Sequence, residues 1–146
     1  MDVIFSKLGA EERTAAFSAF KKYMKPVVDR AFGWDEEFQR SGFHSHLKAE
    51  WFYWIYIRDE KVGILCKRQK ENSIHIHLLI IFTEAQRKGI ATAVTQALIS
   101  NAGEQKVALT LSCFKNNKPA LNLYKKLGFS IKSQDEHFYD FTHECT

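Results

Sequence analysis

The sequence is poor in the residues that mark secreted, repetitive or membrane-spanning chains. Its 146 residues include only three cysteines, without a Cys-x-x-Cys spacing, and only two prolines. An odd number of widely spaced cysteines is typical of a reducing compartment rather than of a disulfide framework. The longest apolar run, Trp51 to Ile57, is far shorter than the roughly twenty residues of a membrane helix. The first residues, Met1 to Lys7, lack the basic and apolar regions of a signal peptide, so we expect a soluble cytoplasmic protein without a membrane partner.

Neither positive nor negative charge is in strong excess. Lys and Arg number 21 against 17 Asp and Glu, for a net charge of +4, and no Lys/Arg run exceeds two residues. This balance suits an anionic small ligand and argues against a dedicated nucleic-acid interface. Repeats, low-complexity stretches and Pro/Gly/Ser linkers are absent, while 45% of the residues are hydrophobic. A single domain covering residues 1–146 is therefore predicted.

Hydrophobic periodicity predicts helices in the first third of the chain and strands after residue 50. Ala10 to Met24 has the spacing of an amphipathic helix, which Pro26 should end or kink before a second helix, Val27 to Phe32. The segment Gly33 to Phe38 should turn from a loop into another short helix. Residues rich in aromatic and β-branched side chains then predict an antiparallel meander. The expected strands are a short opening one, Val3–Phe5, and the meander Trp51–Arg58, Val62–Lys67 and Ser73–Phe82.

The hydrophobic period changes after residue 82. One helical face runs from Ile90 to about Asn101, and a second helix should begin at Pro119 and stop at Gly128. The strands predicted around these helices are Val107–Cys113, Phe129–Ile131 and His137–Phe141. Strands alternating with helices imply that part of the sheet is parallel. The predicted fold class is α/β, with a mixed, mostly antiparallel sheet flanked by helices.

The segment Thr83 to Thr92 leaves a hydrophobic strand and at once opens a helix. A helix N-terminus offers unpaired backbone N–H groups and a partial positive charge, which together hold phosphate. The small residues Gly89 and Ala91 let a ligand approach the backbone, and Arg87 and Lys88 add positive charge. Taken alone, the same residues are equally consistent with a compact turn that binds nothing.

Two blocks of sequence carry a family resemblance. Gln86-x-x-Gly89-x-Ala91 follows the apolar strand, and Asn117-x-x-Ala120-x-x-Leu123-Tyr124-x-x-x-Gly128-Phe129 lies one helix and one strand further on. In this order and spacing the blocks resemble the GNAT superfamily of N-acetyltransferases. The resemblance implies an acetyl-CoA-dependent enzyme that transfers an acetyl group directly to a primary amine within a ternary complex. It also implies that the strand before the turn splays away from its parallel neighbour.

The resemblance assigns the acetyl-CoA site residue by residue. The turn would hold the pyrophosphate, the strand before it and Asn117 would contact pantetheine, and acetyl-CoA would act as cosubstrate. The implied cofactor-binding residues are Leu79, Ile80, Ile81, Phe82, Gln86, Arg87, Lys88, Gly89, Ile90, Ala91, Thr92, Asn117 and Ala120.

Two catalytic roles are expected. By the same resemblance, Tyr124 protonates the departing CoA thiolate, although the helix alone would favour a core tyrosine. Family members often place a carboxylate base on the strand before the turn, where this chain has His75 and His77. Both should project to one face of a regular strand, and His77, nearer the reacting end, is our candidate base. The alternative is a half-exposed strand histidine without a chemical role.

Candidates for the acceptor side lie in the first third of the chain and on the last strand. The loop near the first two helices usually forms the acceptor pocket in this superfamily, and Trp34 and Glu37 fall there, with aromatic and acidic chemistry that suits a cationic amine. Acids at a helix start are just as well explained by the helix dipole. Tyr139 and His137 on the last strand are further candidates. The expected partner is a small-molecule or peptide amine.

Other interpretations stay open at this stage. A catalytically silent acetyl-CoA sensor would keep the fold and lose the chemistry, and the missing strand carboxylate leaves room for it. The pairs His44-x-His46 and His75-x-His77 could bind zinc, but nothing brings them together, so no metal is predicted. A basic patch for nucleic acid is disfavoured by the mild charge. The aromatic run from Trp51 predicts a well-packed strand, within the chain or against a second copy in a homodimer.

Overall fold

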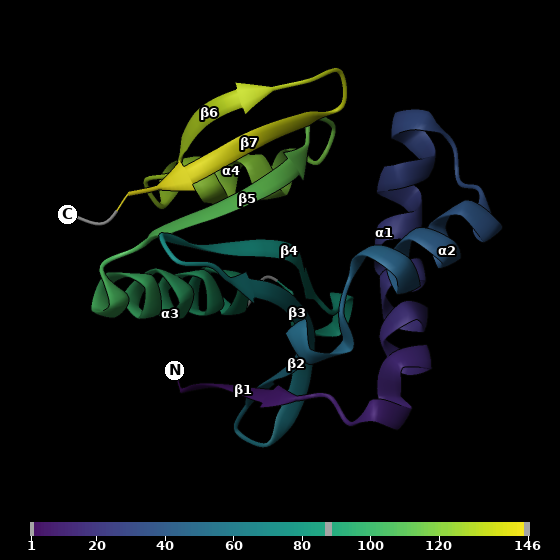
Figure 1. Ribbon diagram of the computed structural model, residues 1–146, viewed down its shortest axis with the longest axis horizontal. Coiled ribbons are helices and arrows are strands. Elements are labelled where there is room, and N and C mark those ends of the chain that lie inside the picture. Colours follow the sequence, from purple (N-terminus) through teal and green to yellow (C-terminus); the bar gives the residue numbers. More distant parts are fainter. Residues whose placement is uncertain (1, 87–88, 145–146) are drawn as a thin grey trace.

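A computed structural model describes residues 2–86 and 89–144 (Figure 1). One seven-stranded sheet runs through the molecule in the order β1-β2-β3-β4-β5-β7-β6. Its strands are β1 (Val3–Lys7), β2 (Phe52–Ile57), β3 (Glu60–Gln69), β4 (Ser73–Ile81), β5 (Ala108–Phe114), β6 (Ser130–Gln134) and β7 (Phe138–His143). The helices are α1 (Arg13–Phe32), α2 (Glu36–His46), α3 (Ile90–Gln105) and α4 (Lys118–Lys126). The predicted α/β class with a mixed, mostly antiparallel sheet is confirmed.

The prediction for the first helices needs one correction. Pro26 lies inside α1, which continues as a single helix to Phe32. A proline removes one backbone hydrogen bond, but Pro26 is on the exposed side, where water can bond the carbonyl that loses its partner. The buried residues Phe17 and Val28, on either side of the proline, hold both parts of α1 in the core.

Two hydrophobic clusters cover the two faces of the sheet. Helices α3 and α4 pack on one face through residues such as Val94 and Leu121. Helices α1 and α2 pack on the other face through Phe17 and Phe43. Strand β2 is buried between its neighbours and these helices, with Phe52 1% exposed. The aromatic run that suggested a second copy is therefore packed within this chain.

A β-bulge changes which side chains of β4 face each cluster. Ile76 pairs with Lys67 and Leu78 pairs with Cys66, so His77 is an extra residue on β4. Before the bulge Ile76 packs toward α3, and after it Leu78 packs toward α1 and α2. A bulge bends its strand and redirects the side chains beside it.

Strands β4 and β5 separate partway along their length. Their parallel register runs from Ser73↔Ala108 to Ile76↔Leu111. Beyond that point β4 continues to Ile81 and β5 to Phe114 with no pairing between the two strands in the described residues. The expected splay is confirmed, and it leaves backbone N–H and C=O groups of β4 open on one side.

The splayed end of β4 packs closely against Gly63 of β3. A Cβ atom at position 63 would lie 2.3 Å from the Ile80 carbonyl oxygen. Because that contact is with backbone, we expect Gly63→Ala to lower the free energy of unfolding by about 1–3 kcal/mol in urea titrations. The control is Gly103→Ala in α3, where a Cβ meets nothing within 4 Å. This change should raise stability by up to about 1 kcal/mol, since alanine favours a helix. Equal effects of the two substitutions would contradict the packing argument.

Candidate functional site

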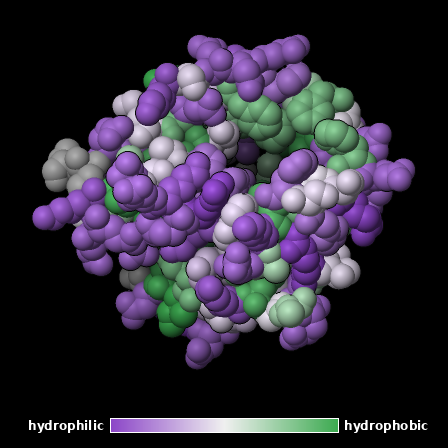
Figure 2. Space-filling view, viewed as in Figure 1, coloured by the Kyte–Doolittle hydropathy of each residue, from purple (hydrophilic) through white to green (hydrophobic). Residues whose placement is uncertain are grey.

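A cavity of about 570 Å³ lies where the two strands separate. It is bounded by α1, the splayed half of β4, the start of α3, and α4. In Figure 2, which keeps the view of Figure 1, this face is hollowed between the α1 side and the ends of β5 and β7. The lining residues are Tyr23, Met24, Val27, Leu79, Ile80, Ile81, Gln86, Gly89, Ile90, Ala91, Thr92, Asn117, Pro119, Ala120, Leu123 and Tyr124. Both sequence blocks therefore meet at one cavity.

The cofactor residues implied by the resemblance are placed almost entirely on this wall. The exceptions are Phe82, which packs behind the wall, and Arg87 and Lys88, which lie outside the described residues. The contribution of α1 was not predicted from the sequence. Tyr23 of α1 stacks on Phe82 with ring centroids 5.1 Å apart, and its hydroxyl donates to the Glu84 carboxylate at 3.0 Å. These contacts attach α1 to the turn after β4.

The turn after β4 is shaped for close approach of a ligand to its backbone. Gly89 caps α3 with φ 75° and ψ 9°, a left-handed conformation that favours glycine, and a Cβ there would project into open space. The side-chain amide of Gln86 donates to the Ile81 carbonyl at 2.8 Å and closes the turn. Because Ile90, Ala91 and Thr92 line the cavity, the free N–H groups of the first turn of α3 lie at its wall.

Helix α4 contributes two polar groups to the cavity. Asn117 is the N-cap residue, but its side chain makes no capping hydrogen bond and stays available at the wall. Tyr124 lies among Phe129 and Phe141, and it is 7% exposed. Burial, with a smaller effect of Cys113, raises the pKa of Tyr124 above its ordinary value, so the phenol is protonated at neutral pH.

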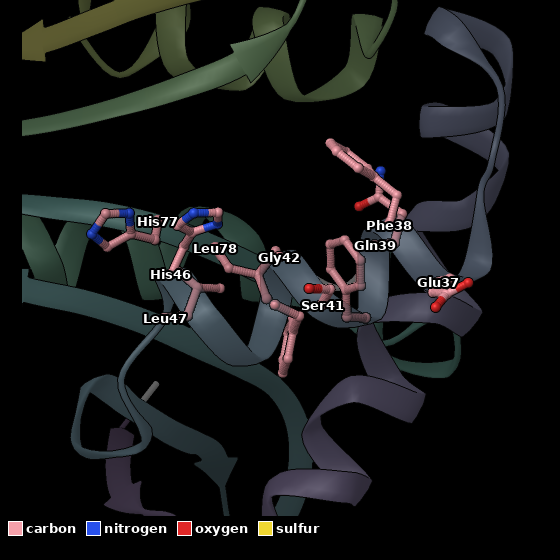
Figure 3. Close-up of a pocket in the computed structure, with 11 residues that line it drawn as sticks. Glu37, Phe38, Gln39, Ser41, Gly42, His46, Leu47, His77 and Leu78 are labelled. Atoms are coloured by element: carbon pink, nitrogen blue, oxygen red, sulfur yellow. The ribbon is translucent and has the colours of Figure 1, made fainter.

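A second cavity, also of about 570 Å³, lies between α2 and β4 (Figure 3). His77 and Leu78 line it, next in sequence to the wall of the first cavity. In Figure 3, His46 and His77 occupy one end and Glu37 the opposite end. His46 was considered in the sequence only as half of a metal-binding pair. The remaining lining residues are Phe20, Phe38, Gln39, Ser41, Gly42, Phe43 and Leu47.

His75 and His77 meet beside the bulge, as the sequence suggested. Their ring centroids are 4.7 Å apart, and His77 also stacks on Trp51 at 5.1 Å. Burial lowers the pKa of His77 to about 4, helped by His75 and the positive charges of Lys70 and Arg68. His77 is therefore neutral at pH 7. His75 Nδ1 lies 2.7 Å from the Thr110 hydroxyl, and burial lowers its pKa as well.

Of the predicted acceptor residues, Glu37 lines the second cavity, and the other three line neither cavity in the described structure. Trp34 Nε1 donates to the Glu36 carboxylate at 3.0 Å, and Glu36 in turn pairs with Lys21 and Arg40. Tyr139 packs into the core on the α3–α4 side of the sheet, away from His77. His137 contacts Phe32 at the edge of α1 with ring centroids 5.0 Å apart.

The histidine pairs do not form a metal centre. His44 and His46 lie in α2, not on a strand, and Arg13 Nε donates to His44 Nδ1 at 2.9 Å. Across residues 2–86 and 89–144, no three His, Cys, Asp or Glu side chains come together in a way that could hold a metal ion. Over the same ranges no helix has the length and apolar character to cross a membrane.

Comparison with known proteins finds a family model and solved structures that are similar to this chain. The model of the "Acetyltransferase (GNAT) family" matches residues 14–129. PaiA N-acetyltransferase from Thermoplasma acidophilum, solved in complex with coenzyme A, is similar over 99% of both chains at 14% identity and a TM-score of 0.75. Arabidopsis thaliana Naa50, solved with a bisubstrate analogue, is similar over 99% of both chains at 15% identity and a TM-score of 0.64.

One curated relative matches in part. The mouse cysteine-rich protein 2-binding protein is 33% identical over 78 residues, which are 53% of this chain. The match spans only 10% of the length of that relative.

The depressed pKa of His77 can be measured directly. We expect its imidazole to titrate near pH 4 in histidine-selective NMR spectra, and His77→Gln identifies the signal. On unfolding, the pKa returns to about 6.5, so the unfolded chain binds more protons between about pH 6.5 and 4. The free energy of unfolding should therefore fall as pH is lowered through that window, less so in His77→Gln. Titration of His77 near 6.5 would show that its surroundings do not disfavour the charged ring.

Proposed function

Because the chain belongs to the GNAT acetyltransferase family, we propose that it transfers an acetyl group from acetyl-CoA directly to a primary amine, with both substrates bound together. The observation that carries this proposal is the meeting of both sequence blocks at the cavity between the splayed strands. The second cavity is bordered by Leu78, the residue before Leu79 at the first cavity. Two substrates can therefore be held at adjacent residues of β4.

The residues at the first cavity fit acetyl-CoA. The free N–H groups at the start of α3, beside the side-chain-free Gly89, suit a pyrophosphate. The unpaired edge of β4 suits the amide groups of pantetheine, since each needs a hydrogen-bond partner. Asn117, free of a capping bond, suits the same arm. Acetyl-CoA supplies an activated acetyl thioester. That PaiA from Thermoplasma acidophilum was solved with coenzyme A supports this assignment.

Tyr124 is the proposed general acid. Tyr124 lines the acetyl-CoA cavity, and its raised pKa keeps the phenol protonated at neutral pH and able to protonate a thiolate. Transfer of that proton to the departing CoA sulfur stabilises the leaving group. Both Tyr124 and Asn117 are present and lie at the cavity, which favours the enzyme over a silent acetyl-CoA sensor.

We propose that His77 helps to remove the proton that the amine must lose. It lies on β4 at the junction of the two cavities and is neutral at pH 7. A pKa near 4 makes it a weak base, so it does not hold a proton taken from an ammonium ion. We assign it the task of orienting a water molecule that carries this proton away. His77→Gln then slows turnover without moving a neutral-range pKa in the rate profile.

The second cavity is the proposed acceptor site. Phe20, Phe43 and Leu78 give it an apolar wall, while His46 and Glu37 give it polar ends. A peptide or small-molecule amine suits this mixture. The Naa50 structure holds a bisubstrate analogue of CoA and a peptide, which supports a peptide amine as one candidate class. A homodimer stays a proposal.

Substitution of Tyr124 by phenylalanine tests the acid role. We expect kcat to fall by about 100-fold or more, because general-acid catalysis is lost, with acetyl-CoA affinity unchanged. Calorimetric titration measures the affinity, and a thiol-release assay across amine classes measures turnover. The control is Tyr53→Phe, since Tyr53 lies on β2 under Lys67 and outside both cavities.

Three outcomes would count against parts of this proposal. Full turnover in Tyr124→Phe removes Tyr124 from the acid role. Acetyl-CoA binding by the unaltered chain without thiol release for any amine class favours the sensor interpretation. No acetyl-CoA binding at all rejects the proposed function.

A further inference from the structure

Asp140 of β7 is a carboxylate held in place by hydroxyl groups and not by a cation. Ser112 of β5 donates to Oδ1 at 2.6 Å, and Ser133 of β6 donates to Oδ2 at 2.7 Å. In the described parts of the chain, Asp140 has no Lys, Arg or His ion-pair partner within 4 Å. These two hydrogen bonds lower the pKa of Asp140, so it carries a full negative charge at pH 7. Each oxygen keeps a free lone pair for a further donor.

The sheet register puts Asp140 on the acceptor side. Thr110 is opposite His75 across β4 and β5, and Asp140 is opposite Ser112 across β5 and β7. Directly paired residues share a face, so Asp140 faces the same side as His75. In Figure 1, α4 lies behind this half of the sheet, and no helix crosses in front of β5, β7 and β6. Asp140 is therefore reachable from the side on which the amine enters.

Positive charge lies on the β3 side of this face, and negative charge lies on the β7 side. Arg68 is paired with His75 on the β3 side, and the positive charges of Arg68 and Lys70 lower the pKa values of both strand histidines. On the β7 side Asp140 carries a negative charge that has no Lys, Arg or His partner within 4 Å among the described residues. Glu36 at the start of α2, by contrast, is paired with both Lys21 and Arg40. A cationic group on this face is drawn toward β7 and away from β3.

Aromatic rings lie next to Asp140. Phe138 is two residues before it on the same face, and its ring centroid lies 4.3 Å from that of Phe114. Phe32 of α1 packs on Phe114 at 5.9 Å and is 48% exposed. Figure 2 shows hydrophobic side chains gathered beside the hollow at the α1 end of β5 and β7. Aromatic faces attract organic cations and cover their methylene groups.

We propose that Asp140, oriented by Ser112 and Ser133 and flanked by Phe114 and Phe138, binds a second positive charge of the acceptor. This inference rests on the proposed acetyl transfer and narrows its substrate to a dibasic amine. Asp140 is two strands away from β4, at least about 10 Å, because β4 and β5 separate beyond Ile76↔Leu111. The second charge is accordingly separated from the reacting nitrogen by a short aliphatic or peptide segment, and not adjacent to it.

The experiment compares two amines with the same five-carbon chain, 1-aminopentane and 1,5-diaminopentane. Each is tested with the full chain and acetyl-CoA. For the unaltered chain we expect a lower KM for the diamine. Asp140→Asn keeps the shape and removes the charge, so it should raise the diamine KM about 10-fold or more and leave the monoamine KM unchanged. Ser133→Ala keeps the charge and frees its orientation, so it should give a smaller increase for the diamine alone. The control is Glu136→Gln, an exposed acid on the same β6–β7 hairpin, which should change neither KM.

A binding measurement separates this inference from the enzymatic proposal. Calorimetric titration of the CoA-loaded chain with 1,5-diaminopentane should show weaker binding in Asp140→Asn, even where no turnover is seen. Unchanged acetyl-CoA affinity confirms that this variant is folded. Equal diamine binding in Asp140→Asn and the unaltered chain, or equal loss for both amines, would overturn the subsite while leaving acetyl transfer intact. Failure of the unaltered chain to bind acetyl-CoA would instead reject the enzymatic proposal.

Discussion

Strands β4 and β5 pair only from Ser73↔Ala108 to Ile76↔Leu111, and the rest of the site depends on this limited pairing. Backbone N–H and C=O groups that leave a sheet must find other partners or face water. In this chain they face a cavity that α1, α4 and the start of α3 enclose. The separation thus creates both the space for a long ligand and the hydrogen-bonding edge along which that ligand can lie.

The bulge at His77 explains why two cavities meet at one strand. Without the extra residue, β4 would keep a strict alternation along its whole length. With it, both His77 and Leu78 turn toward α1 and α2, and Leu79 turns toward the other side. Consecutive residues therefore border the acceptor side and the proposed acetyl-CoA side. In a regular strand Leu78 would share the face of Ile76, toward α3, and would not line the cavity beside α2.

The sequence predicted the parts of the site that are continuous in the chain. The strand, the turn and the helix start around Gly89 are consecutive, so their spacing alone carries the geometry. The full length of helix α1 was harder to predict, because a proline on the exposed side of a well-anchored helix does not break the helix. The proposed acceptor side draws on residues far apart in sequence, such as His46 and Asp140. The packing of α2 against β4 places His46, and the sheet register places Asp140.

On the last strand, a shift of one residue decides which side chain faces the acceptor side. Tyr139 and Asp140 are neighbours, and successive residues of a strand face opposite sides. The sequence favoured Tyr139, but the register with Cys113 sends its ring into the core. Asp140, which carries no aromatic signal, is the residue that reaches the open face. Whether a strand begins one residue earlier or later is not encoded in its local composition.

The charges around the junction serve two different needs of an amine acceptor. The reacting nitrogen must lose its proton, and the positive charges of Arg68 and Lys70 near His75 and His77 disfavour an ammonium ion there, as they disfavour protonated imidazole. A second amine that keeps its proton needs a negative partner, and Asp140 offers one across β5. Positive charge on the β3 side and negative charge on the β7 side would therefore orient a dibasic acceptor with its neutral end at β4. Reversing the acceptor would place a cation beside Arg68 and leave Asp140 without a partner, so one orientation is favoured at both ends.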